Sequence, residues 1–367
     1  MNIERLHKIL LELQTEFNNR DLLIQIQDVR DNLANQVSNP QQPQYQQNLV
    51  AALNLLNESL EKSPFNDFSP SWIQVIEEIG GKNLFGNELK EQIEEIFNRN
   101  QITPSAALDE INIIYAKVEK LKNAVEELIS GFTKLNIGKE DLLPGQCELG
   151  YSIPRLVIDN KLSSFSKEVQ ELNFILGTFS EVIEGKKGNF DIKTISSSDF
   201  LLYVIIGLQV ADTLSNAIEK IINNYKTILE IKVLRNQLKE KGVPETATKE
   251  IEEHANSSME NLIRQIASEV ISQYHLKDEV ARKNELENAT VIALNKIANR
   301  IDKGFNLEVR VEPLPAATEK EKTDTNHQEK LLRISNIQKQ SRTLQYINTI
   351  GEPILQLSEK EEVKPKK

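Results

Sequence analysis

Residues 111–128 read INIIYAKVEKLKNAVEEL, and their apolar residues recur alternately three and four positions apart. The repeat comprises Ile111, Ile114, Val118, Leu121, Val125 and Leu128, and it continues formally to Phe132 and Leu135. A repeat of 3.5 residues keeps one narrow apolar stripe turned towards a partner helix. The pattern therefore predicts a long helix that begins at Pro104, ends near Gly131 and packs lengthwise against another helix.

The same rhythm recurs in two other segments. One comprises Leu162, Phe165, Val169, Leu172, Leu176, Phe179 and Ile183. The other comprises Ile3, Leu6, Leu10, Leu13 and Phe17. Several seams of this kind in one chain predict long helices that lie side by side.

Three short segments alternate apolar and polar residues as strands do, at 149–153, 190–194 and 307–311. Pro154 places the first of them at a sheet edge or a bulge, because proline cannot donate to a central ladder. We therefore predict a mainly α fold with a minor β component (α+β). It consists of long antiparallel coiled-coil-like helices and a small three-stranded sheet.

Residues 200–211 read FLLYVIIGLQVA and form the most apolar run of the chain. Twelve residues are too few to cross a bilayer, which takes about 20. We interpret the run as the buried start of a helix that extends to Gly242. Its stripe is Ala211, Leu214, Ile218, Ile221, Tyr225 and Ile228, which then shifts to Ile231, Leu234 and Leu238. A segment that dips into a membrane is the alternative.

Composition divides the chain into five segments. They are residues 1–62 with a Gln- and Pro-rich loop at 38–48, residues 63–146 ending in a seam helix, residues 147–312 with the long helices and the sheet, a linker at 313–328, and residues 329–367 with an amphipathic helix and a tail. The linker lacks the apolar content needed to order by itself. The apolar residues beyond it predict a C-terminal arm that docks.

The formal net charge of -11 repels phosphate backbones and anionic lipids, so neither nucleic acid nor a membrane is the expected partner. Cys147 is the single cysteine, which excludes an internal disulfide and zinc sites built from several thiolates. The N-terminus lacks the apolar block of a signal peptide. We expect a cytoplasmic location.

Residues able to carry chemistry are sparse. Glu4 and His7 have the spacing of half a di-iron bundle site, but no second copy is present, so we interpret His7 as a solvent-facing helix residue. Catalysis at Cys147 would need a histidine brought beside it by the fold, and a structural thiol is the simpler interpretation. No Gly-rich phosphate loop occurs. We expect no cofactor, no metal and no catalytic residue.

These observations favour a non-catalytic helical interaction or scaffold subunit that binds a protein partner or forms a homo-oligomer. An enzyme with a hidden, metal-dependent site and a peripheral membrane protein are the alternatives. The candidate interaction residues are Leu331, Ile334, Leu344, Ile347, Arg155 and Arg310. For the two arginines, cross-strand ion pairs with Asp191 or Glu308 are the competing interpretation.

Overall fold

The computed structural model describes residues 3–196, 200–241, 245–275, 280–315, 317, 324–344, 346 and 352–360. They form two compact units, Met1–Asp141 and Leu142–Lys367. Each unit has its own cluster of buried apolar side chains.

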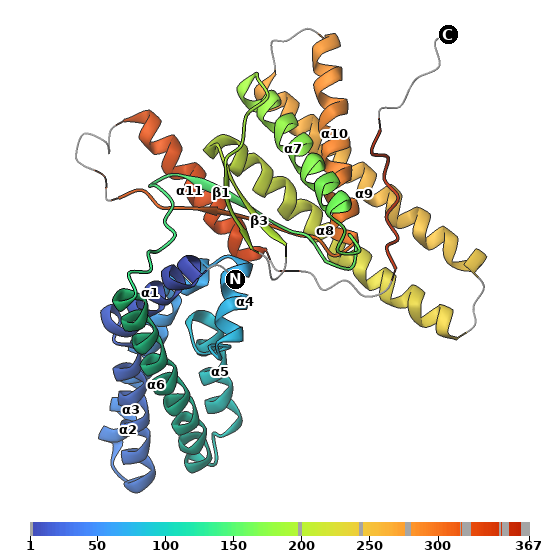
Figure 1. Cartoon of the computed structure of the whole chain (residues 1–367). Helices are drawn as coiled ribbons and strands as arrows, with labels where there is room; N and C mark the ends of the chain where they lie inside the picture. The colour runs from blue at the N-terminus through green and yellow to red at the C-terminus, as the bar shows by residue number, and fades with distance from the viewer. Residues whose placement is uncertain are drawn as a thin grey trace. The chain divides into compact units, whose positions relative to one another are not determined.

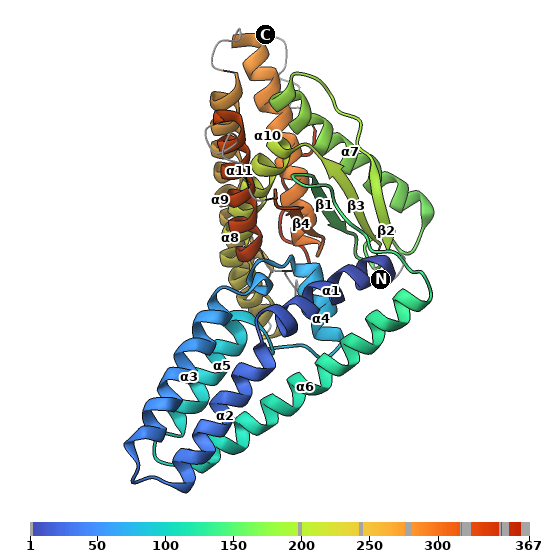
Figure 2. The ribbon, with the colours of Figure 1, turned by 90° about the vertical axis from the view of Figure 1, so that its left-hand side faces the viewer.

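The first unit is helical. Its elements are α1 (Ile3–Asn19), α2 (Leu22–Ser38), α3 (Pro43–Glu61), the short 3-10 helix η1 (Pro64–Asp67), α4 (Pro70–Glu78), α5 (Gly86–Arg99) and α6 (Pro104–Lys134). Figures 1 and 2 show α2, α3, α5 and α6 side by side as an elongated bundle, with α1 and α4 at one end of it.

Proline is the first residue of three α-helices of this unit, α3, α4 and α6. The first helical turn has amides without intrahelical partners, so proline costs no hydrogen bond there. This confirms the expected start of α6 at Pro104. It corrects the loop predicted at residues 38–48, because α3 already begins at Pro43.

The seam of α6 is confirmed over its first five positions. Ile111, Ile114, Val118, Leu121 and Val125 are all buried. Beyond them Ile129 and Phe132 are buried, whereas Leu128 is 43% and Leu135 is 72% exposed. A straight helix repeats every 3.6 residues rather than 3.5, so the buried face moves to the next residue over a long helix. The helix also continues past Gly131 to Lys134.

The second unit holds the remaining elements. They are β1 (Cys147–Ser152), α7 (Leu162–Glu184), β2 (Ile192–Ser196), β3 (Leu201–Ile206), α8 (Leu208–Glu240), α9 (Glu245–Tyr274), α10 (Val280–Asp302), β4 (Asn306–Val311) and α11 (Thr325–Thr343). The fold class is therefore mainly α with a minor β component, as predicted. The predicted seam of α7 packs into the core at Leu172, Leu176 and Phe179, while Leu162 at its start is 81% exposed.

One antiparallel sheet of four strands, in the order β2-β3-β1-β4, occurs in the described part of the chain. Three strands were predicted, and β1 was placed at an edge. β1 is central because Pro154 lies beyond its last residue and removes no ladder hydrogen bond. Residues 155–160, which follow Pro154, form turns.

The strand that was missed is β3, within the apolar run at residues 200–211. That run was interpreted as a helix start, but α8 begins only at Leu208, after Gly207. Six residues rich in β-branched and aromatic side chains suit a strand buried on both faces, where the apolar periodicity disappears. Three serines precede this run at 196–198. Ser196 ends β2, and residues 197–199 are outside the described range.

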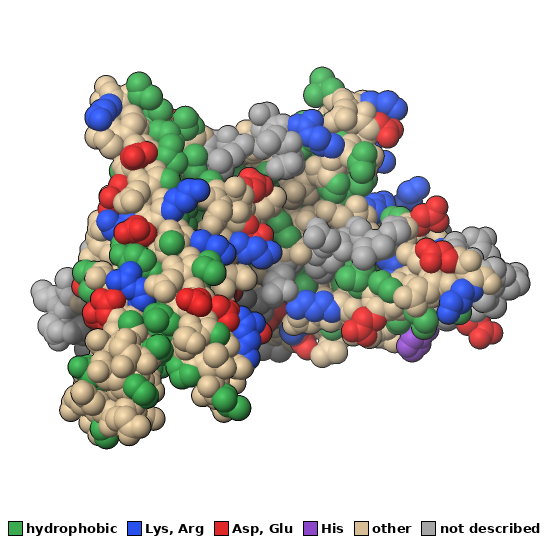
Figure 3. All heavy atoms as spheres, turned by 90° about the horizontal axis from the view of Figure 1, so that it is seen from below, with side chains coloured by type: hydrophobic (Ala, Val, Ile, Leu, Met, Phe, Trp, Pro, Cys, Tyr) green, Lys and Arg blue, Asp and Glu red, His purple; other side chains and the backbone are tan. Residues whose placement is uncertain are grey.

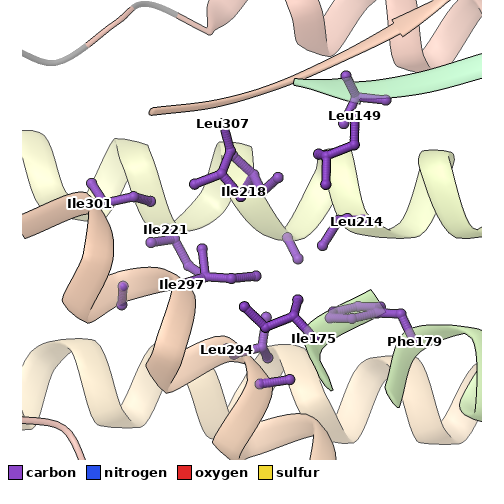
Figure 4. Packing of buried hydrophobic residues seen from close by; sticks show 14 of the residues in the cluster. Leu149, Ile175, Phe179, Leu214, Ile218, Ile221, Leu294, Ile297, Ile301 and Leu307 are labelled. Atoms are coloured by element: carbon purple, nitrogen blue, oxygen red, sulfur yellow. The ribbon is translucent and has the colours of Figure 1, made fainter. Parts of the chain in front are cut away.

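The sheet buries one apolar face in the core of the unit. Leu149 pairs with Val204 on one side and with Val309 on the other, so all three side chains share a face. Figure 4 shows Leu149 and the β4 residue Leu307 above α8, with α7 and α10 on the opposite side of that helix. α8 is thus the central helix of the unit.

Candidate interaction site

The predicted stripe of α8 is confirmed as far as Ile228, and there it departs from expectation. The sequence predicted a shift to another face at Ile231 and Leu234, but Leu234 is 50% exposed. The helix keeps its face, and Lys232 and Arg235 occupy the next buried positions. Lys232 has no exposed side-chain area. A cation in such a place requires a carboxylate beside it.

Asp302, the last residue of α10, supplies that carboxylate. Its Oδ1 accepts a hydrogen bond from the Lys232 ammonium at 3.0 Å and from the Tyr225 hydroxyl at 2.6 Å. Burial first, and the Asp302 charge second, raise the pKa of Tyr225 above its usual 10.0, so the hydroxyl stays a donor. Arg235 forms an ion pair with Glu252 of α9, whose carboxylate lies 2.5 Å from the Arg235 Nε.

The other carboxylate oxygen of Asp302 binds the C-terminal end of the described chain. Oδ2 accepts from the backbone N–H groups of Ile354 and Leu355, both at 2.6 Å. Residues 352–360, hereafter the docking segment, have no helical or strand pairing of their own. Their backbone groups therefore need partners from elsewhere when they are buried.

Asparagine side chains provide most of those partners. Asn256 of α9 donates to the Ile354 carbonyl at 3.0 Å and accepts from the Gln356 N–H at 2.7 Å. Asn299 of α10 donates to the Leu357 carbonyl at 2.9 Å and accepts from the Leu357 N–H at 3.1 Å. A side-chain amide used in this way replaces the neighbouring strand of a sheet, since it offers one donor and one acceptor.

A third asparagine fixes the direction of the segment. Asn295 of α10 donates to the carbonyl of Ser358 at 2.7 Å. The contacts from Asp302 through Asn299 to Asn295 thus meet successively later residues of the docking segment. The segment therefore runs antiparallel to α10, along one stripe of that helix at spacings of three and four residues.

Side chains of the docking segment alternate in their surroundings. Ile354, Leu355 and Leu357 are 1%, 5% and 4% exposed and belong to the core of the unit. Gln356 and Ser358 are exposed. Figure 1 shows the segment as an extended trace beside α9 and α10. We define the segment-binding surface as Asn256, Asn295, Asn299 and Asp302, which bind the segment directly, together with Tyr225 and Lys232 of α8, which bind the Asp302 carboxylate.

The carboxylate of Glu359, near the end of the docking segment, contacts polar and charged residues of α10. Its carboxylate lies 3.4 Å from Lys296 and 3.5 Å from Arg300, and it accepts a hydrogen bond from Asn299 at 2.9 Å. Burial raises the pKa of Glu359, but the Asn299 hydrogen bond and the two cations outweigh it and hold the pKa below the ordinary 4.5. Lys296 and Arg300 are also paired with carboxylates of α7.

The predicted arm residues divide between core and surface. Ile334 and Leu344 are each 4% exposed and pack in the core, where α11 contacts α8 and β4. Leu331 is 41% exposed at the N-terminal end of the helix. Ile347 lies outside the described residues. α11 begins at Thr325, so the last four residues of the predicted linker are helical.

The two arginines lie in different surroundings. Arg310 of β4 stands opposite Glu148 of β1 and pairs with it at 2.9 Å. A cross-strand ion pair is thus present, and its acidic partner is Glu148. Arg155 lies over the Phe200 ring, 4.2 Å from its centroid, and donates to Asn160 at 3.2 Å.

The residues examined for catalysis are occupied by structural roles. His7 is 8% exposed, which contradicts the solvent-facing interpretation, and its Nδ1 lies 3.0 Å from the Ile137 carbonyl. Burial raises the pKa of Cys147 to about 12, so the thiol stays protonated. Among the described residues, no three His, Cys, Asp or Glu side chains gather as metal ligands. Within the same residues, no helix has the length and apolar content to span a membrane.

A polar hollow of about 480 Å³ lies elsewhere in the unit, among α8, α9 and α11. Two of its three acidic residues form ion pairs within the unit: Asp212 pairs with Arg333 at 3.0 Å, and Glu269 pairs with Lys220 at 2.7 Å. This hollow therefore has fewer unengaged groups for a ligand, and we take the segment-binding surface, which binds the docking segment of the same chain, as the candidate site.

Sequence reasoning overlooked the segment-binding surface. The signal was present in α10, where Asn295, Asn299 and Asp302 interrupt an apolar helix at spacings of four and three. A second signal was the pair Lys232 and Arg235 on the apolar stripe of α8. A polar stripe on an otherwise buried helix indicates a buried polar partner.

The face of the molecule shown in Figure 3 carries side chains of both charges. In Figure 3, basic side chains lie among acidic ones over the coloured part of the face shown. No family model, no curated protein and no solved structure matches the chain. The function must therefore be argued from the site.

Proposed function

We propose that the chain is a non-catalytic interaction protein that binds an extended peptide segment of another protein. The observation that supports this proposal most directly is that Asn256, Asn299 and Asp302 form hydrogen bonds with the backbone of the docking segment. Backbone groups are common to every peptide, so a surface that satisfies them suits a peptide from another chain as well. The buried aliphatic side chains add the affinity that hydrogen bonds alone do not supply.

The alternative functions have less support. The metal-dependent enzyme requires a hidden site built from distant residues. In the pair with the spacing of half a di-iron bundle site, Glu4 and His7, the histidine is engaged by backbone carbonyls of residues 137 and 138. The membrane protein rested on residues 200–211, whose side chains at Leu202, Val204 and Ile206 are in the core of the second unit. A cytoplasmic location remains the proposal that suits a single buried thiol.

The test is exchange of the docking segment. The recognition sequence of a site-specific protease is placed in residues 345–351, between α11 and the docking segment. The intact chain is purified, its melting curve is compared with that of the unmodified protein, and it is then cut. A fluorescent peptide with the sequence of residues 352–360 is added, and uptake is followed by anisotropy.

We expect the cut chain to take up the labelled peptide and release its own segment. The uncut chain is the matched control, because its tether holds the segment at an effective concentration on the order of millimolar. Its apparent affinity for the peptide should be lower by about 10²–10⁴-fold. A cut chain that retains its own segment and takes up no peptide would contradict the proposal, since the segment would then be a permanent part of the core.

A further inference from the structure

We propose that the segment-binding surface recognises a partner segment with two adjacent aliphatic residues, a third aliphatic residue two positions later, and a carboxylate two positions after that. The docking segment is the internal competitor of that ligand. This inference rests on the interaction function proposed above and names its ligand class. The pattern is that of Ile354, Leu355, Leu357 and Glu359, read in the direction antiparallel to α10.

The specificity follows from which groups of the docking segment are enclosed. Backbone hydrogen bonds fix direction and register without reading side chains. Ile354, Leu355 and Leu357 are enclosed in the core, so a polar residue at any of these places would be buried without a partner. Gln356 and Ser358 are exposed and leave their positions open to many residues. Lys296 and Arg300 select an acid at the last position.

Within the described part of the chain, the docking segment leaves one acceptor of the segment-binding surface, Asn295 Oδ1, without a hydrogen bond. Asn256 and Asn299 use both atoms of their amide groups on the segment backbone. Asn295 is 5% exposed and uses its nitrogen only; its Oδ1 is buried and has no hydrogen-bond donor among the residues described. A buried acceptor without a donor weakens a complex by about 5- to 150-fold.

That vacant acceptor favours a partner protein over a second copy of this chain. A second copy carries the same segment and gains no new hydrogen bond on Asn295. At micromolar concentration, either occupant competes against a tethered segment at about millimolar effective concentration, a disadvantage of about 10³-fold that only additional contacts can offset. A partner segment that donates an N–H to Asn295 Oδ1 gains a hydrogen bond that the docking segment does not make.

The experiment uses the cut full chain and a panel of labelled peptides. The reference peptide has the sequence of residues 352–360. Leu357→Ala tests the aliphatic position, Glu359→Gln tests the acid, and a reversed sequence tests direction. Gln356→Ala is the matched control at an exposed position. Light scattering of the uncut chain across a concentration series tests the second copy as occupant.

We expect Leu357→Ala to weaken uptake by at least about 30-fold and Glu359→Gln by about 10-fold. Gln356→Ala should change it by less than about 3-fold, and the reversed peptide should not bind. No uptake of the reference peptide would refute the interaction function itself.

Uptake of the reference peptide with equal uptake of the Leu357→Ala and reversed peptides would overturn only the ligand class. A concentration-dependent dimer of the uncut chain that the reference peptide dissociates would assign the surface to a second copy and overturn the choice of a partner. A chain monomeric throughout the series supports that choice.

Discussion

At the scale of single residues, Asp302 joins three parts of the second unit. Its carboxylate binds Lys232 and Tyr225 of α8 and two amides of the docking segment. Each of these donors is buried, so the loss of the negative charge leaves a positive charge without compensation. A substitution at Asp302 should therefore lower the stability of the fold more than a substitution at the end of a helix usually does.

Asp302→Asn should lower the free energy of unfolding by about 3–5 kcal/mol, because it leaves Lys232 as an uncompensated buried cation. Urea unfolding of the full chain measures this. Asp191→Asn, the same substitution at an exposed aspartate, is the matched control and should cost less than about 0.5 kcal/mol. An Asp302→Asn protein within about 1 kcal/mol of the parent would show that the ion pair is not needed.

The lowered pKa of Glu359 predicts how docking of the segment depends on pH. Its pKa is lowered when the segment is docked, so the ionised carboxylate favours docking. The contribution is fully present above the ordinary pKa of 4.5 and is lost as the pH falls through the lower, docked value. The stability difference between the parent and Glu359→Gln should therefore be constant above pH 4.5 and shrink below it. A difference that persists at acid pH would exclude the ion pairs as its source.

At the scale of elements, sequence periodicity predicted α1, α6, α7 and the greater part of α8. It misjudged the positions where polar side chains are buried. The stripe of α8 was followed correctly from Ala211 to Ile228 and then lost, because Lys232 and Arg235 do not look like core residues. β3 was missed because a strand buried on both faces has no alternation to detect. The partners that explain these residues, Asp302 and Glu252, are distant in sequence, and no local pattern indicates them.

For α7, Leu172→Ala should cost about 2–5 kcal/mol by leaving a cavity in the core. Leu172 is 2% exposed, whereas Leu162 at the start of the same helix is 81% exposed. Leu162→Ala is therefore the control and should change stability by less than about 0.5 kcal/mol. Equal denaturation midpoints for the two variants would refute the register of the helix.

For the C-terminal arm, limited proteolysis should cut first within residues 313–324. Their composition predicts no order of its own, whereas α11 from Thr325 packs on α8 and β4 through Ile334 and Ile337. After the cut, the α11 fragment should remain bound during size-exclusion chromatography. First cleavage inside α11, or loss of that fragment from the cut protein, would show that the helix is not docked.

At the scale of the whole molecule, the fold class could be predicted from the sequence and the candidate site could not. Helix stripes and strand alternation are local, so they indicated the mainly α fold with a small sheet. The segment-binding surface is assembled from three helices. The docking segment that it binds lies more than 50 positions further along the chain than its contacts on α10. The docking of the arm was predicted from Ile334 and Leu344, but the residues 354–359 that complete it were assigned to the tail.

The central claim is that the docking segment is held by the core yet can leave it while the rest of the unit stays folded. Native-state hydrogen exchange tests this at the amides of Leu355 and Leu357, which donate to Asp302 and Asn299. We predict that both are protected and exchange through a local opening that low urea does not accelerate, whereas the amide of Ile297 in α10 exchanges only through global unfolding. Exchange of the two segment amides at the rate of an unstructured peptide, or only together with Ile297, would contradict the account.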